Sequence, residues 1–194
     1  SLPLPELLDR LSSRLDALAE APDADPRQET LRATIQWSYD LLSPEEQTLF
    51  ARLSVFSGGC TLEAAEEVCE ADIDTLQSLV DKSLVRFTDG RYWLLETIRE
   101  FAGERLDASG EAEAMRGRQA RWAVHLSTAA HEGLRGTDQG LWFERVASEE
   151  NNLIAAMTWL SAVGRWDDLV AVLFLSRRYW EIRSVPSRLR AWYD

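Results

Sequence analysis

Lys82 and Ser83 are the adjacent residue types that end a phosphate-binding loop of the Gly-x-x-x-x-Gly-Lys-Ser/Thr kind. The glycines of such a loop let backbone amides approach the phosphate oxygens closely. In the segment LQSLVDKS, Leu76 and Asp81 stand where the two glycines should be. The sequence therefore predicts no phosphate-binding loop here. It favours a helix C-terminus, where the Lys82 cation faces the negative end of the helix dipole.

The remaining reactive residue types are few or poorly spaced. His125 and His131 are the two histidines, and no cysteine or carboxylate pair stands near them to complete a metal site. Glu149 and Glu150 are adjacent on a predicted helix and point apart, so we expect a solvated face rather than acid–base catalysis. A Ser-His-Asp triad can assemble from distant residues, but no Gly-x-Ser-x-Gly turn is present. We expect no enzymatic activity, no cofactor and no metal in this chain.

Charge is distributed unevenly along the 194 residues, of which 45% are hydrophobic and which carry a formal net charge of -12. Residues 1–110 carry 10 basic and 22 acidic side chains, whereas residues 111–194 carry 11 of each. An acidic surface repels phosphate backbones, so we expect no direct nucleic-acid ligand. Only two cysteines and no apolar run of about 20 residues are present, which predicts a cytoplasmic protein with no membrane partner.

The elements that must position these residues begin with two helices. Five leucines spaced four and three apart predict a helix over residues 5–19, and the acidic, proline-containing residues 20–28 predict a linker. The following helix carries one stripe through Ile35, while Trp37 and Leu41 lie on its opposite side. Both sides of this helix therefore need a partner.

The pattern of a winged helix follows. Ser43-Pro44 predicts a helix start, two short helices are expected over residues 61–69 and 72–82, and Asp89-Gly90 predicts a type I′ hairpin turn. A further helix is expected from about residue 95 to 108. Three helices followed by a β-hairpin is the order of a winged helix. Its third helix would expose Asp74, Gln77, Ser78 and Asp81, a face poorly suited to DNA.

Residues 111–194 show only helical periodicity. Helices are expected over 112–133, 138–160 with a break near Ser148, 166–183 and 186–194. A helical repeat runs through Trp166, Leu169, Val170, Leu173, Phe174, Arg177 and Trp180, and the tryptophans at 122, 142, 159, 166, 180 and 192 are expected to pack between helices. The predicted fold is mostly α, with a winged-helix domain that contains a small β-hairpin, followed by a TPR-like helical array. We expect three parts: residues 1–26, the end of a helical domain plus linker; residues 27–110, the winged helix; and residues 111–194, an incomplete array.

Three stretches carry a resemblance to a known family: LRATIQWSYDLLSPEEQTLFARLSVFSGG, LQSLVDKSLVR and RYWLLETIREFAGERL. They resemble the winged-helix segment of NB-ARC-type STAND ATPases, specifically the large bacterial transcriptional regulators of the LuxR and antibiotic-regulator type. The resemblance covers residues 27–108. DQGLWFERVASEENNLIAAMTW is similar to the start of the TPR-like sensor region of those regulators. We therefore expect this chain to be a segment of a longer protein.

The resemblance implies a multidomain switch in signal transduction, with ATP or ADP bound by an upstream P-loop domain that this chain lacks. The family's Met-His-Asp motif falls on Leu94, Leu95 and Glu96, and Leu95 cannot make the nucleotide contact of the family's histidine. These three residues and Arg99 are candidate interdomain contacts. Trp37 and Leu41 are two more, expected to pack against the helical domain represented by residues 4–18.

The function expected from the sequence is that of a non-catalytic regulatory and scaffold segment. It would couple the nucleotide state of the P-loop domain to a helical array that senses a protein or a small molecule. One alternative is a self-contained protein-interaction module that uses the helical array. The other is direct DNA binding by the winged helix.

Overall fold

A computed structural model describes residues 26–183, and its backbone contacts divide the chain into two compact units, Ser1–Ser43 and Pro44–Asp194. The first unit contributes one described helix, α2 (Pro26–Asp40). Ile35 is buried, whereas Trp37 and Leu41 are 53% and 62% exposed. The predicted partner of these two side chains, the helix over residues 5–19, lies outside the described residues, and so does the helix expected after residue 185. Both remain predictions.

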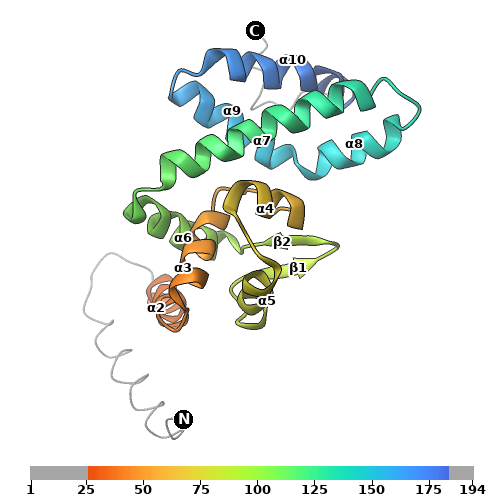
Figure 1. The fold of residues 1–194 in the computed structure, drawn as a ribbon. Helices are drawn as coiled ribbons and strands as arrows, with labels where there is room; N and C mark the ends of the chain where they lie inside the picture. Colours follow the sequence, from red (N-terminus) through yellow and green to blue (C-terminus); the bar gives the residue numbers. More distant parts are fainter. Residues whose placement is uncertain (1–25, 184–194) are drawn as a thin grey trace, which may run out of the picture. The chain divides into compact units, whose positions relative to one another are not determined.

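The second unit begins with three short helices, α3 (Pro44–Leu53), α4 (Leu62–Cys69) and α5 (Ile73–Asp81) (Figure 1). Side-chain caps fix where two of them start. The Thr61 hydroxyl accepts a hydrogen bond from the Ala64 amide at 3.3 Å, and the Asp72 carboxylate accepts one from the Thr75 amide at 2.8 Å. Each cap satisfies an amide that the helix leaves without an internal partner, which defines the helix boundary.

The wing is an antiparallel hairpin of β1 (Arg86–Thr88) and β2 (Arg91–Trp93), with Phe87 opposite Tyr92. Asp89 and Gly90 have φ angles of 52° and 76°, as the predicted type I′ turn requires. Helix α6 (Glu96–Ser109) follows and packs against α3, where the rings of Phe50 and Phe101 lie 6.3 Å apart. Three helices and a hairpin therefore share one core, which confirms the predicted winged helix.

Within residues 111–183 the structure describes the array as four helices: α7 (Ala112–Gly133), α8 (Gln139–Ser148), α9 (Glu150–Ala162) and α10 (Trp166–Arg183). The long helix α7 contacts the other three, and it also contacts α4 and α6 of the winged helix (Figure 1). The predicted break near Ser148 separates α8 from α9. Among the helices that the structure describes, none is long and apolar enough to cross a membrane.

Only part of the stripe that the sequence suggested for α10 is buried. Leu169 and Trp180 of that stripe are buried, as is Val172 outside it, whereas Trp166, Val170 and Phe174 are more than half exposed. The helix is apolar on two sides, so periodicity located the helix correctly but did not identify the side that faces α7 and α9. The expectation that Trp166 packs between helices is wrong in the described structure.

Candidate interdomain coupling site

The turn between α3 and α4, residues 57–60, is the part of the winged helix that meets α9. Gly59 has a φ of +70°, and a Cβ atom there would lie 2.6 Å from the Tyr92 carbonyl oxygen. Only glycine fits this approach without displacing backbone. The next residue, Cys60, exchanges two backbone hydrogen bonds of 2.8 Å with Tyr92. The turn is thereby fixed along the free edge of β2.

Asn152 of α9 holds this turn with its whole side-chain amide. Its Nδ2 donates to the Gly59 carbonyl at 2.8 Å, and its Oδ1 accepts from the backbone amides of Ser57 at 2.8 Å and Gly58 at 3.3 Å. Asn152 is fully buried. The Gln119 side chain of α7 donates to the backbone carbonyl of Asn152 at 2.9 Å. A buried amide with all these partners fixes the position of the turn on the array.

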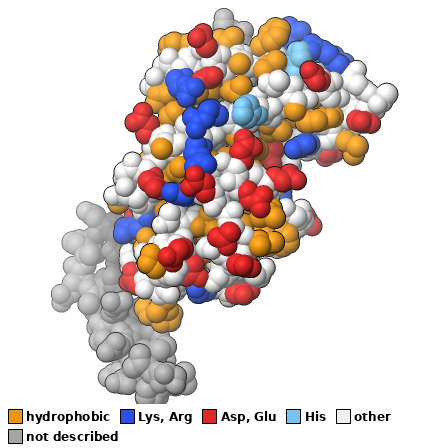
Figure 2. Space-filling model, viewed as in Figure 1, with side chains coloured by type: hydrophobic (Ala, Val, Ile, Leu, Met, Phe, Trp, Pro, Cys, Tyr) orange, Lys and Arg blue, Asp and Glu red, His pale blue; other side chains and the backbone are white. Residues whose placement is uncertain are grey.

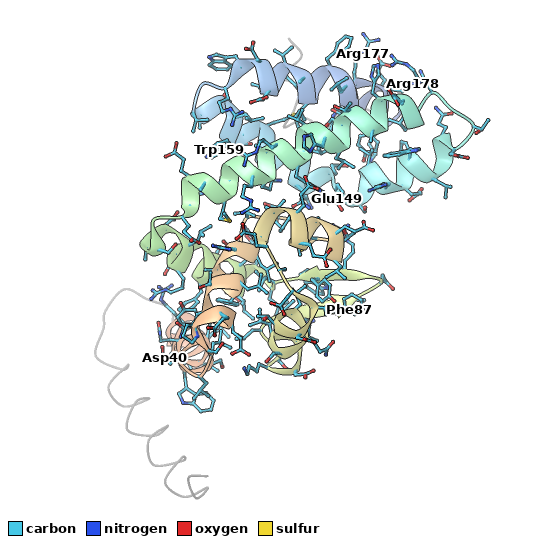
Figure 3. All side chains as sticks on the ribbon, viewed as in Figure 1. Asp40, Phe87, Glu149, Trp159, Arg177 and Arg178 are labelled. Carbon is cyan, nitrogen blue, oxygen red and sulfur yellow. The ribbon has the colours of Figure 1, made fainter. Side chains whose placement is uncertain are left out.

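A buried ion pair adjoins the asparagine. Glu149 lies at the junction of α8 and α9 and is 4% exposed, and its carboxylate pairs with the guanidinium of Arg91 at the start of β2. The Glu149 Oε2 also accepts from the Asn152 Nδ2 at 2.7 Å, while Arg91 Nη2 donates to the Gly59 carbonyl at 2.9 Å. Figure 3 shows Glu149 where the array meets the winged helix. The expectation of a solvated Glu149 is therefore wrong.

We call this group the polar link and define it as Arg91, Glu149, Asn152 and the backbone of residues 57–59. It joins three elements that are distant in the sequence: the turn before α4, the wing and the start of α9. Each charge in it has an opposite charge, and each side-chain amide atom has a partner. Removal of any member leaves a buried polar group without its partner, which makes the geometry specific.

A second, more exposed network joins α3, α4 and α7. Arg52 donates through Nε and Nη2 to both carboxylate oxygens of Glu111 at 2.9 and 3.0 Å, and through Nη1 to Glu70 at 2.9 Å. Arg118 of α7 donates to the other oxygen of Glu70 at 2.6 Å. The hydrogen bonds from Arg118 and Arg52 lower the pKa of Glu70, and the hydrogen bond from Arg52 lowers the pKa of Glu111.

These lowered pKa values predict a pH dependence of stability. A carboxylate whose pKa falls on folding stabilises the protein above its unfolded pKa, and that stabilisation is lost as the pH falls through the folded pKa. We expect the free energy of urea unfolding to fall between about pH 5 and pH 3, and Glu111→Gln to reduce that slope. The share of Glu111 should be under about 1 kcal/mol, because exposed pairs are screened by water and salt. Glu113→Gln, on an exposed site of α7, should leave the slope unchanged.

Apolar contacts complete the interface between the winged helix and the array. The buried rings of Phe56 and Trp122 meet edge to face, with centroids 5.8 Å apart. Trp122 therefore packs between helices, as its sequence context predicted. Edge-to-face aromatic pairs add stability beyond the area that they bury.

The predicted contact residues at the end of the wing divide into two kinds. Leu94 is half-buried and lines a small cavity in the winged-helix core, whereas Leu95 is exposed and precedes α6 without capping it by a side chain. Glu96 accepts from Arg99 Nη2 at 2.6 Å and from its Nε at 3.1 Å, which lowers the pKa of Glu96. The structure brings Glu96 and Arg99 together, and it gives Leu94 and Leu95 no polar role.

The lysine and the two histidines considered for chemistry each contact a side chain of another element. Lys82 Nζ pairs with the buried carboxylate of Glu46, which Ser78 also contacts. The ring of His131 stacks on Phe174 with centroids 6.0 Å apart, while His125 lies 3.4 Å from a glutamate on α4. Within residues 26–183, no group of three or more metal-binding side chains is present.

The exposed side of α5 is acidic, as the sequence predicted. Asp74, Gln77 and Asp81 are exposed, and Gln77 donates to Asp81 at 2.8 Å. Ser78, predicted to be exposed with them, instead turns toward Glu46 at 2.5 Å. On the face in Figure 2, acidic side chains are scattered over the winged helix, and basic side chains form a column above them over the array.

Comparison with known proteins agrees with this fold. Residues 42–107 match the family described as winged helix-turn-helix domain, and we assign these residues to such a domain. The match supports nucleic-acid binding and so conflicts with the expectation that this segment has no nucleic-acid ligand.

Relatives extend the similarity into the array. A protein of Mycobacterium tuberculosis (strain H37Rv) named "Putative HTH-type transcriptional regulator" is 35% identical over 179 residues, which are 87% of this chain and 20% of that protein. A Mycobacterium bovis protein of the same description matches to the same extent. An uncharacterized protein of M. tuberculosis is 40% identical over 134 residues, 62% of this chain and 33% of that protein. The chain thus spans a fifth to a third of these relatives. No solved structure matches it.

Arg91, Glu149 and Asn152, the side chains of the polar link, were not predicted from the sequence as a site. Asn152 and Glu149 lie in a stretch, SEENNL, whose polar letters are typical of an exposed helix start. Arg91 stands directly after a hairpin turn, where basic residues are usually solvated. A signal was present in the two glycines at residues 58 and 59, because paired glycines indicate a place where another backbone or a buried polar group approaches closely.

Proposed function

We propose that this chain is the regulatory and scaffold segment of a larger, ATP-dependent transcriptional regulator of the STAND type. In this proposal an upstream P-loop domain binds ATP or ADP, the winged helix contacts that domain, and the array senses a protein or small-molecule effector. The match to winged helix-turn-helix domains and the names of the mycobacterial relatives support a role in transcription regulation. The chain itself would do no chemistry.

The polar link is the observation that carries the proposal. A buried ion pair and a fully bonded asparagine join the winged helix to the array, so a displacement of one is passed to the other as a rigid-body movement. The exposed Trp37 and Leu41 supply apolar surface on the side expected to face the ATPase. A segment built this way can couple nucleotide state to the array without contacting the nucleotide.

Direct DNA binding is the second candidate, and the family match favours it. The acidic surface of α5 argues against DNA binding. Its exposed Asp74 and Asp81 would face phosphates in the usual docking of a third helix, and its one adjacent lysine is held by Glu46. We therefore rank DNA binding by this domain below the coupling role.

An anisotropy titration separates the two functions. We expect residues 1–194 to leave a fluorescein-labelled DNA duplex unbound up to about 10 µM protein at 50 mM salt, because the face that would dock is acidic. Asp74→Lys combined with Asp81→Lys should raise nonspecific binding by at least about tenfold. Glu63→Lys plus Glu66→Lys on α4 is the charge-matched control. Sequence-dependent binding of the unaltered protein below about 1 µM would establish the DNA-binding role instead.

The coupling role needs the longer polypeptide that carries a P-loop domain. Hydrogen exchange of that protein with ADP and with a non-hydrolysable ATP analogue should change at Trp37 and Leu41 and at the array together. Asn152→Leu should leave the change near Trp37 and abolish it in the array. Identical exchange of the array in the two nucleotide states would refute the proposal.

A further inference from the structure

The outward side of α10 carries an apolar stripe, which we define as Trp166, Val170 and Phe174. The three side chains are 59%, 60% and 59% exposed, and their spacing of four places them along one side of the helix. Val172 lies on the side that packs on α7 and α9, and the ring of Phe174, at one edge of the stripe, stacks on His131 of α7 with centroids 6.0 Å apart. In Figure 1 α10 runs along the outer edge of the array. A continuous exposed apolar stripe of this kind marks an interaction surface.

Charge on α10 is divided between its two ends. Asp167 and Asp168 stand in the first turn, and Arg177 and Arg178, both exposed, stand in the second half, where Figure 3 labels them. Asp168 is held by Arg165, and Arg177 contacts Glu181 at 3.1 Å. The charges of Asp167 and Arg178 therefore contribute most to the attraction available to a partner.

The same face is thus complementary to itself. An antiparallel second copy of α10 brings the acidic end of each helix toward the basic end of the other, while the two apolar stripes meet between them. A parallel copy would bring like charges together. Antiparallel helix dipoles also attract each other. A contact that uses one patch on both partners closes as a two-fold dimer.

We propose that α10 is a self-association surface on which a second copy of this chain packs antiparallel through the apolar stripe. The contact is small, because three partly exposed side chains supply a few hundred Å², below the roughly 1,200–2,000 Å² buried in stable complexes. We therefore expect a weak dimer. This inference does not depend on the proposed regulatory function.

Sedimentation velocity of residues 1–194 between about 5 and 500 µM tests the surface. The weight-average sedimentation coefficient should rise with concentration toward that of a dimer. Val170→Glu should abolish the rise, since it places a charge in the centre of the stripe. Leu141→Glu is the matched control, because Leu141 is 75% exposed on α8 and lies outside the stripe. Circular dichroism confirms that each variant remains folded.

Charge exchange tests the antiparallel orientation. Arg178→Glu should weaken association at least about threefold, and adding Asp167→Arg should restore it, because both ends are then reversed together. A monomer at all concentrations would overturn the proposal, and so would a dimer unaffected by Val170→Glu or not restored by the double reversal. A monomer in which Trp166→Phe leaves the acrylamide quenching of tryptophan fluorescence unchanged would also overturn it and would show that the chain's own residues cover the stripe.

Discussion

Glu149→Leu should reduce the free energy of unfolding by about 3 kcal/mol, because it leaves the Arg91 guanidinium largely buried without its carboxylate. The change also removes the oxygen that accepts from Asn152 at 2.7 Å. Removing one partner of a buried pair costs more than the pair contributes, since the remaining charge has lost both its water and its counter-charge. Urea unfolding followed by far-ultraviolet circular dichroism measures the effect.

A double-mutant cycle isolates the pair. Arg91→Met combined with Glu149→Leu should recover most of the lost stability, because two apolar side chains leave no uncompensated charge. Glu144→Leu, at an exposed site of α8, is the control and should change the free energy of unfolding by less than about 0.5 kcal/mol. If the double variant is as unstable as the sum of the single variants, Arg91 and Glu149 do not interact in solution.

Local chemistry made the fold of the winged helix predictable. Ser43-Pro44 predicts the start of α3. Asp89-Gly90 favours a type I′ turn, which requires positive φ at both central positions, and both residues have positive φ in the structure. Signals of this kind depend on a few consecutive residues. They hold whatever the rest of the chain does, so the order of helices and hairpin followed from the sequence.

The candidate site could not be predicted in the same way, because its members meet only in three dimensions. Arg91 and Glu149 are 58 residues apart, and Asn152 contacts Gly59 across 93 residues. Each is polar, and a polar residue on a short helix or beside a turn is usually solvated. Burial of such a residue is decided by packing against a distant element, which the period of a single helix does not report.

The buried side of α10 could not be predicted fully for a related reason. Val170 and Val172 are both apolar, yet one is 60% exposed and the other is fully buried. Helical periodicity identifies the buried side of a helix only when the other side is clearly polar. In α10 apolar residues occur on both sides. Contacts with α7 and α9 decide which side is covered.

Asn152→Leu should destabilise the protein by about 3 kcal/mol, although leucine has the same number and branching of side-chain heavy atoms as asparagine. The variant leaves the amides of Ser57 and Gly58 without their acceptor, and each buried group that loses its partner costs about 1–3 kcal/mol. The Gly59 carbonyl keeps the hydrogen bond from Arg91, which limits the loss. Urea unfolding gives the total effect, and hydrogen exchange at residues 57 and 58 gives its location.

Thr158→Ala is the control for that variant, since it changes an exposed side chain on the same helix whose hydroxyl donates to the Ile154 carbonyl of that helix. We expect a change within about 0.5 kcal/mol and unaltered exchange at Ser57. Both substitutions remove a polar side chain from α9. A difference in the free energy of unfolding between the two variants therefore measures the contribution of the Asn152 side-chain amide that binds the turn. Equal stability of the two variants would mean that the turn is held by Arg91 and the backbone bonds to Tyr92 alone, and the polar link would then reduce to its ion pair.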